Sequence, residues 1–311
     1  MNPERTDIAV RCQGLVKRYA DVVAVNGLDL EVRRGECFGL LGPNGAGKTT
    51  TIEILEGLTP PDAGEVELLG STWTRDGRAL RERLGISLQE TQLNEKLTVG
   101  ETIRLFRSFY EKGRDPEAVL AQLSLDEKRD ARVGKLSGGQ KQRLAVACAL
   151  VGDPEMLFLD EPTTGLDPQS RLQLWEQVIQ FRAGGGSILL TTHYMDEAER
   201  LCDRVAVVDR GKVIALGTPT ELIASLHAAN VIEFSSEPEL DEASLRTLPG
   251  VTEPYRRGPN WWLPVGSLAT TVPALLALVD RSGARLVNLS THRSTLEDVF
   301  VSLTGRALRE D

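Results

Sequence analysis

Residues 1–225 combine short apolar runs with stretches of helical periodicity. Cys37–Leu41 is apolar on both faces, which is typical of a buried central strand. A glycine-rich segment follows it, and Thr51–Leu58 then has helical character. The alternation predicts an α/β domain. Further strands are predicted at Ile8–Cys12, Val22–Val25, Leu28–Val32, Glu65–Leu69, Leu84–Leu88, Met156–Leu159, Ser187–Thr191 and Arg204–Asp209.

Two other regions depart from this pattern. Between Glu101 and Ala131 the apolar residues recur at helical spacing, which predicts a helical subdomain at about residues 92–150. From about residue 226 Lys disappears and Pro becomes frequent. The order of predicted strands and helices in residues 226–311 is βαββαβ, which suits a small C-terminal α+β domain of the split-βαβ type. The sequence therefore predicts two domains, 1–225 and 226–311.

Composition narrows the class of protein. The chain has 36 basic and 45 acidic residues among 311, so its formal net charge is −9. This balance argues against a general nucleic-acid binder, which usually presents an excess of Lys and Arg to the phosphates. No apolar stretch approaches the roughly 20 residues of a membrane helix, and the polar start lacks a signal core. We therefore expect a cytoplasmic protein. Its four scattered cysteines are expected to be reduced and mostly buried.

The glycine-rich segment fits the pattern Gly-x4-Gly-Lys-[Ser/Thr]. Glycines let successive backbone N–H groups turn inward around phosphate oxygens, and the following helix adds the partial positive charge of its N-terminus. Lys48 is expected to reach the outer phosphates, and the Thr49 hydroxyl a Mg²⁺ ion. The sequence predicts a nucleotide site formed by Gly42, Pro43, Asn44, Gly45, Ala46, Gly47, Lys48, Thr49 and Thr50.

A second candidate is the apolar strand Met156–Leu159, which ends in two carboxylates. Adjacent strand residues point to opposite faces, so Asp160 and Glu161 are expected to serve different tasks. Asp160 would order Mg²⁺ and its hydration shell. Glu161 would act as general base, or orient the attacking water, for in-line attack on the γ-phosphate.

A third glycine-rich segment, Ser137, Gly138, Gly139 and Gln140, opens an apolar helix shortly before this strand. It resembles the signature motif of ABC-type ATPases, and the other motifs stand in that family's order over about residues 6–225. The resemblance implies a P-loop NTPase fold of ABC type that binds ATP and Mg²⁺. It also assigns Tyr19 to stacking on adenine, Gln89 to the Q-loop near Mg²⁺ and the attacking water, Asp167 to the D-loop, and His193 to contact with the γ-phosphate.

The same resemblance implies partners. In a head-to-tail homodimer, Ser137–Gln140 of one copy would close over ATP held by Gly42–Thr50 of the other. A separate integral membrane permease subunit would dock near Thr91–Thr98, which would place the chain on the cytoplasmic face of the cell membrane. The segment Ser294–Gly305 resembles the closing motif of the drug-resistance, daunorubicin-resistance-type export ATPases. That likeness suggests a drug-like or hydrophobic cargo.

Other functions remain open at this point. A soluble ABC ATPase acting on nucleic acid or the ribosome is the main alternative, although the acidic balance and the single nucleotide domain argue against it. A regulatory module that binds ATP but scarcely hydrolyses it would not need Glu161 and His193. A P-loop kinase would leave the signature helix unexplained.

Overall fold

The structure is a computed structural model and describes residues 7–88 and 91–304. The chain divides into two compact units, Met1–Leu216 and Gly217–Asp311. The sequence placed this boundary near residue 225. The difference is the helix α8 (Pro219–Ala224), which packs against α11 (Leu296–Thr304) inside the C-terminal unit.

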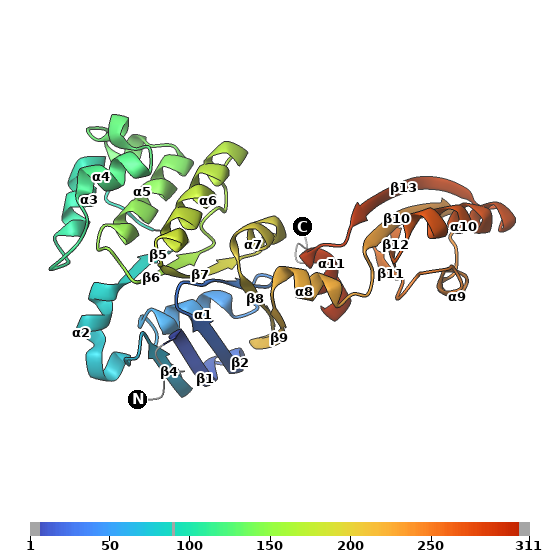
Figure 1. Ribbon diagram of the computed structural model, residues 1–311, viewed down its shortest axis with the longest axis horizontal. Coiled ribbons are helices and arrows are strands. Elements are labelled where there is room, and N and C mark those ends of the chain that lie inside the picture. The colour runs from blue at the N-terminus through green and yellow to red at the C-terminus, as the bar shows by residue number, and fades with distance from the viewer. Residues whose placement is uncertain (1–6, 89–90, 305–311) are drawn as a thin grey trace. The chain divides into compact units, whose positions relative to one another are not determined.

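The N-terminal unit contains two sheets (Figure 1). The first is antiparallel, with strand order β2-β1-β4, and the second has six strands in the order β5-β6-β7-β3-β8-β9. Neighbouring strands from β5 to β8 run parallel. Cys37–Leu41, predicted to be a buried central strand, is fully buried and lies inside this sheet. The strands are β1 (Ile8–Tyr19), β2 (Val22–Arg33), β3 (Cys37–Leu41), β4 (Ala63–Leu68), β5 (Leu84–Ser87), β6 (Met156–Asp160), β7 (Ser187–Thr192), β8 (Arg204–Asp209) and β9 (Lys212–Gly217).

One predicted break in the first sheet is wrong. Val22–Val25 and Leu28–Val32 were expected to be separate strands, yet both belong to β2. The pairing register with β1 shifts between Leu28 and Asn26, so that Gly27 is the extra residue of a bulge. Its φ of 72° is open to glycine without strain, so the strand continues through a segment that resembles a turn in the sequence.

Seven α-helices lie in the described part of the N-terminal unit. The helices α3, α4 and α5 pack together, in agreement with the helical subdomain predicted for residues 92–150. Thr98 begins α3 with a capping box: its hydroxyl accepts from the backbone N–H of Glu101, and its own N–H donates to the Glu101 carboxylate. The pattern of the sequence did not predict α2 or α6. The helices are α1 (Lys48–Leu55), α2 (Trp73–Arg83), α3 (Val99–Arg107), α4 (Pro116–Gln122), α5 (Gly138–Leu150), α6 (Pro168–Ala183) and, as a further short one, α7 (Met195–Leu201).

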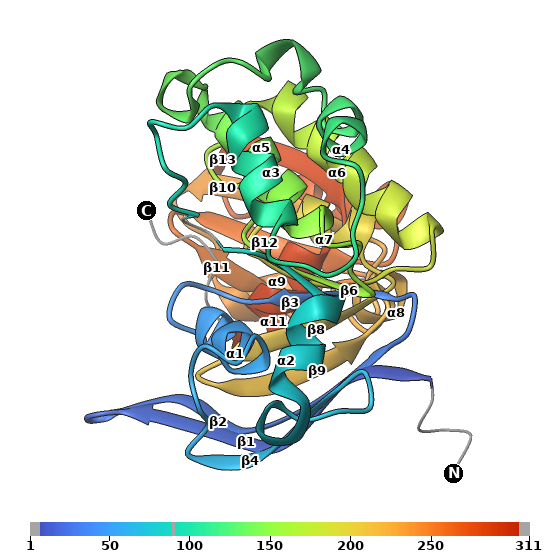
Figure 2. The same cartoon turned by 90° about the vertical axis from the view of Figure 1, so that its left-hand side faces the viewer.

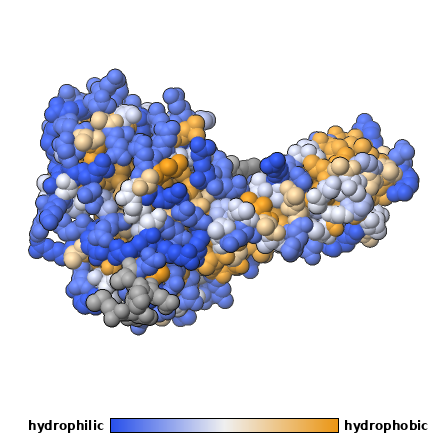
Figure 3. Space-filling view, viewed as in Figure 1, coloured by the Kyte–Doolittle hydropathy of each residue, from blue (hydrophilic) through white to orange (hydrophobic). Residues whose placement is uncertain are grey.

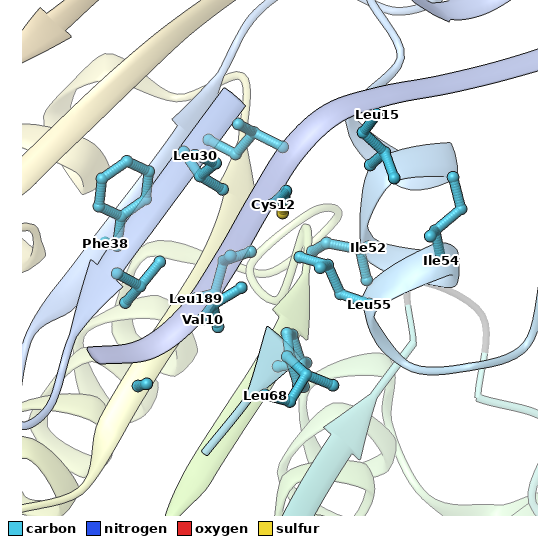
Figure 4. Packing of buried hydrophobic residues seen from close by; sticks show 14 of the residues in the cluster. Val10, Cys12, Leu15, Leu30, Phe38, Ile52, Ile54, Leu55, Leu68 and Leu189 are labelled. Carbon is cyan, nitrogen blue, oxygen red and sulfur yellow. The ribbon is translucent and has the colours of Figure 1, made fainter. Parts of the chain in front are cut away.

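The main core lies where α1 and the two sheets meet (Figure 4). Val10 and Leu15 of β1 face Ile52 and Leu55 of α1, and Phe38 of β3 belongs to the same cluster. All five side chains are fully buried. Burying such side chains stabilises a fold by roughly 1.5–3 kcal/mol each, so this core holds α1 firmly behind the loop that precedes it.

The C-terminal unit is a four-stranded antiparallel sheet with the order β11-β12-β10-β13. β12, the third strand of this unit in the sequence, lies between the first strand, β10, and the second, β11. This is the predicted split-βαβ arrangement. Trp261 is buried in its core, whereas Trp262 packs against Tyr255 and His292 on the other face. Apolar residues gather over α10 and β13 in Figure 3. Besides α8 and α11, the elements are β10 (Asn230–Glu237), α9 (Glu242–Arg246), β11 (Tyr255–Arg257), β12 (Asn260–Val265), α10 (Leu268–Arg281) and β13 (Arg285–Arg293).

Two further expectations can be compared with the described residues. All four cysteines are free and buried, as predicted. Among residues 7–88 and 91–304, no helix is both long enough and apolar enough to cross a membrane.

Candidate nucleotide site

The glycine-rich loop connects β3 to α1, as the motif requires. A Cβ atom on Gly42 would lie 2.3 Å from the Val208 carbonyl oxygen, and one on Gly47 would lie 2.2 Å from that of Ala24. Gly47 also has φ 100°, which disfavours any residue with a side chain. The two glycines therefore hold the ends of the loop against neighbouring strands, while Gly45 between them faces open space.

Lys48 is the first residue of α1, and its ammonium group is buried under the loop. Its Nζ donates to the carbonyl oxygens of Gly42 (2.8 Å) and Pro43 (3.1 Å) and lies 3.6 Å from Glu161 Oε1. Burial lowers the pKa of Lys48, and the negative charges of Glu161 and Asp160 oppose that effect. The result is a positive charge positioned at the helix N-terminus, where backbone N–H groups also favour an anion.

Asp160 ends β6 and is nearly inaccessible to solvent. Its Oδ1 accepts a short hydrogen bond from the Thr191 hydroxyl of the neighbouring strand β7. Burial raises the pKa of the Asp160 carboxyl, while the hydrogen bonds from Thr191 and Thr49 and the charge of Lys48 act in the opposite direction. Asp160 and Thr49, both predicted as metal ligands, are therefore in hydrogen-bond contact.

Glu161 does not continue the strand. It has φ 47°, an uncommon left-handed conformation for a residue with a side chain, and its N–H donates to the Thr191 hydroxyl (3.0 Å). The reasoning that alternation would send the two carboxylates to opposite faces is therefore wrong, because β6 ends at Asp160. Both carboxylates instead act on Lys48. Backbone strain of this kind is concentrated at functional sites.

The Glu161 carboxylate is surrounded by hydrogen-bonding groups. Its Oε2 lies 3.1 Å from Nδ1 of His193 and accepts from the Thr164 hydroxyl at 3.2 Å. His193 directly follows β7, which lies between β6 and β3 in the sheet. The strand order thus brings Lys48, Glu161 and His193 together from three separate parts of the chain.

The signature segment has a different environment. Ser137 caps α5 through a reciprocal pair of hydrogen bonds with Gln140. A Cβ on Gly139 would lie 2.6 Å from the Ser170 hydroxyl, next to Asp167, which caps α6. Gly138, in contrast, faces open space. In Figures 1 and 2, α5 lies in the upper part of the unit and α1, which the phosphate loop precedes, in the lower part.

Two predicted residues, Tyr19 and Asp167, lie at the periphery. Tyr19 ends β1 and is 45% exposed, with Lys17 Nζ 5.5 Å from its ring centroid, so its ring is accessible. Asp167 is exposed, and the hydrogen bonds from Ser170 lower its pKa. Gln89 lies outside the described residues, so the structure says nothing of its place.

The donor set fits a magnesium ion shared with phosphates. Among the residues the structure describes, no group of three or more His, Cys, Asp or Glu could enclose a metal by itself. Mg²⁺ usually takes one or two protein ligands and completes its shell with water and substrate phosphates. Thr49 and Asp160, which lie in contact beside the loop, are a set of that kind.

Comparison with known proteins identifies the family. Residues 25–164 match the ABC transporter family. A protein named Nod factor export ATP-binding protein I from Burkholderia orbicola (strain AU 1054) is 44% identical, over 94% of this chain and 96% of that protein. One of the same name from Ralstonia nicotianae (strain ATCC BAA-1114 / GMI1000) is 41% identical, over 96% and 94%. The chain belongs to the ABC transporter family. It is the ATP-binding subunit of an ABC transporter and an ATP-hydrolysing transport ATPase.

Solved structures agree on the fold of this ATP-binding subunit. The structure of an ATP-binding subunit of an ABC transporter is 29% identical, with a TM-score of 0.65, over 70% of this chain and 93% of that one. The cbiO1 protein from Clostridium perfringens, part of the ABC transporter complex cbiONQ, is 31% identical, with a TM-score of 0.63, over 70% and 91%. The predicted ABC-type P-loop fold with a helical subdomain is therefore confirmed.

Reasoning from the sequence missed several residues that shape the ABC site. Thr191 holds both Asp160 and the backbone of Glu161, Thr164 donates to the Glu161 carboxylate, and Ser170 packs against Gly139. Only Thr191 left a signal, since it stands in a Thr-Thr pair just before His193. Thr164 and Ser170 follow β6 in a segment without a regular hydrophobic pattern, so no sequence pattern indicated their contacts with Glu161 and Gly139.

Proposed function

We propose that this chain is the ATPase subunit of an exporter that works as a homodimer on a separate membrane permease, with Mg²⁺-ATP bound at Gly42–Thr50. The single observation that carries the proposal is the grouping of Lys48, Asp160, Glu161 and His193 around the phosphate loop. The export direction comes from the relatives, whose names refer to Nod factor export. The expected location is the cytoplasmic face of the cell membrane.

Each residue then has a chemical task. Loop N–H groups and Lys48 bind the phosphates, and Tyr19 stacks on the adenine. Thr49 and Asp160 would hold Mg²⁺, with Gln89 near it, and that ion would neutralise charge on the phosphate oxygens. Glu161 orients the attacking water, and His193, whose Nδ1 lies 3.1 Å from Glu161 Oε2, contacts the γ-phosphate. Binding of the phosphates would draw Lys48 away from Glu161, so that the Glu161 carboxylate could accept a proton from the attacking water.

The dimer follows from the position of the signature helix. Gly138 faces open space at the N-terminus of α5, where backbone N–H groups favour an anion, but α5 and the helix α1 that follows the chain's own loop lie in different parts of the unit. A second copy in head-to-tail orientation would bring Ser137–Gln140 to the nucleotide. Asp167, which caps the adjacent helix α6, would lie at the same interface.

The cargo is the least specific part of the proposal. The tail Ser294–Gly305 resembles drug-resistance export ATPases, whereas the relatives are named for Nod factor export. A drug-like or hydrophobic compound is the class we propose. Gly305 and the residues after it lie outside the described residues, so that part of the tail motif stays a prediction.

Replacing Glu161 by Gln tests the assigned reaction. The variant keeps the shape of the side chain but cannot accept a proton, so it should bind ATP and accumulate as a nucleotide-bound dimer on gel filtration. Hydrolysis should fall by at least about 100-fold, as is typical when a positioned general base is removed. Glu176→Gln, an acidic-to-amide change on α6 outside the site, is the matched control. Hydrolysis by Glu161→Gln at the rate of the control would refute the role of Glu161.

A further inference from the structure

A second feature of the N-terminal unit is a cavity of about 330 Å³ between α1, α2, β5, α3 and α5. It is near the lower end of the roughly 300–1,000 Å³ range of small-ligand pockets, so it suits a single side chain rather than a whole helix. The residues that line it are Glu56, Leu58, Trp73, Arg81, Glu82, Leu84, Ile86, Phe106, Phe109, Tyr110 and Cys148.

Glu56 has an unusual environment in this cavity. It is the residue that caps the C-terminal end of α1, and only 3% of it is exposed. Within the described part of the chain, neither of its carboxylate oxygens has a hydrogen-bond partner. The charged groups that act on it, Asp160 and Glu53, are both acidic and add to the effect of burial in raising its pKa to about 8. A buried carboxylate without a partner is costly, which calls for an explanation beyond packing.

The other walls of the cavity are largely aromatic. Trp73 is fixed in place by a hydrogen bond from its Nε1 to the Leu55 carbonyl oxygen (2.8 Å). It also packs on Gly57, where a Cβ would lie 2.6 Å from the ring. Phe109 and Leu58, at 63% and 59% exposure, leave apolar surface at the rim. Aromatic faces beside a desolvated carboxylate bind organic cations, and guanidinium groups most readily.

Arg81, the basic residue that lines the cavity, does not form a hydrogen bond with the Glu56 carboxylate. Arg81 lies over the Trp73 ring, with its Cζ 5.7 Å from the centroid, and the structure gives Glu56 no hydrogen bond to it. The combination of an exposed apolar rim, aromatic walls and a buried acid at the floor is that of an interface pocket for one anchoring residue. We propose that this pocket receives a single Arg or Lys side chain of the membrane subunit, which pairs with Glu56 when the two subunits assemble.

This inference rests on the proposed function, because it needs a membrane subunit. It adds a link between that subunit and the nucleotide: Glu56 ends the helix that Lys48 begins, and Asp160 acts electrostatically on Glu56. A cation seated in the pocket and a nucleotide seated on the loop would therefore influence each other, and any such coupling is reciprocal.

The test uses the full chain, tagged and co-expressed with the multi-span membrane protein whose gene lies next to its own. The amount of that protein captured in detergent is compared for the wild type, Glu56→Gln, Arg81→Gln and Glu53→Gln. Glu53 is the matched control, since it is an acidic residue of the same helix that does not line the cavity. We expect capture to fall at least tenfold with Glu56→Gln and to persist with the other two variants. A melting curve of each variant shows that it is folded.

A charge exchange then identifies the cation. In the Glu56→Lys chain, each Arg and Lys in the cytoplasmic segments of the multi-span protein is replaced by Glu in turn. Recovery of at least half of the wild-type capture with one of these changes supports the pairing, and recovery with none overturns it. As a probe for a free ligand, methylguanidinium is titrated into the isolated chain. Stabilisation that depends on Glu56, together with undiminished capture by Glu56→Gln, would assign the pocket to a small cation and overturn our proposal.

The outcomes separate the two proposals. If the wild-type chain captures no multi-span protein, the proposed transport function itself fails. If the wild type and Glu56→Gln capture it equally, the transport function stands and only the role of Glu56 is wrong.

Discussion

Replacing Glu56 by Gln is expected to stabilise the isolated, nucleotide-free chain, and to do so increasingly as the pH rises. The structure raises the pKa of Glu56 from 4.5 to about 8 through burial and the charges of Asp160 and Glu53. The folded protein therefore holds a proton that the unfolded chain has already released. Below about pH 4 both states are protonated, and ionisation carries no cost. The loss of folding free energy that ionisation of Glu56 causes grows between pH 4.5 and about pH 8, the pKa values of the unfolded and folded states, and is constant above that range.

The magnitude follows from this window. One pKa unit corresponds to about 1.4 kcal/mol, so the wild type loses about 3 kcal/mol relative to Glu56→Gln between pH 5 and pH 8. For a unit of 150–250 residues, each kcal/mol shifts the melting temperature by roughly 2–4 °C. The gap in melting temperature between the variant and the wild type should thus widen by roughly 6–12 °C over that range. Gln is nearly isosteric with protonated Glu, so packing changes little.

The assay is thermal unfolding of both proteins at matched ionic strength from pH 5 to pH 8, with Glu176→Gln as the control. The gap for the control should stay constant, since that side chain is exposed on α6, lies outside the cavity and does not act on Glu56. Besides Asp160 and Glu53, the ionisable groups nearest the cavity are Arg81, Glu82, Tyr110 and Cys148. A pH-independent gap for Glu56→Gln would mean that a cation such as Arg81 pairs with Glu56 in the isolated chain, and would refute the reasoning.

Three further predictions concern the nucleotide site. Lys48→Ala should weaken ATP binding by about 10- to 100-fold in calorimetry, the value of a charge-assisted hydrogen bond; unchanged affinity would contradict the phosphate-loop assignment. Thr191→Val should lower stability by about 1–3 kcal/mol, because it removes the buried hydroxyl that donates to Asp160 and accepts from the Glu161 N–H, and should slow hydrolysis; an unchanged melting temperature and turnover would contradict this. Tyr19→Ala should weaken ATP binding by roughly 1–3 kcal/mol, with Tyr19→Phe close to wild type; equal affinities of the two variants would argue against stacking.

The local chemistry of the site was readable from the sequence. A buried strand, a glycine-rich loop and a helix starting at Lys48 follow one another directly, and each depends on neighbouring residues only. The capped helix start at Ser137 and the apolar strand before Asp160 were also predictable, because caps and strand periodicity are short-range patterns. The sequence by itself therefore determined which segments supply the charged side chains of the site and which supply backbone N–H groups that can bind phosphate.

Only the tertiary structure decided how these segments meet. The order β6-β7-β3 brings Asp160, His193 and Lys48 to one edge of the sheet, and no local pattern encodes which parallel strands become neighbours. Strand alternation predicted that the Glu161 carboxylate would point away from Asp160. The left-handed backbone at Glu161 instead places this carboxylate near Lys48. Glu56 is the clearest case. In the sequence it is one acidic residue among many, and its burial without a hydrogen-bond partner among the described residues exists only because four other elements close around it.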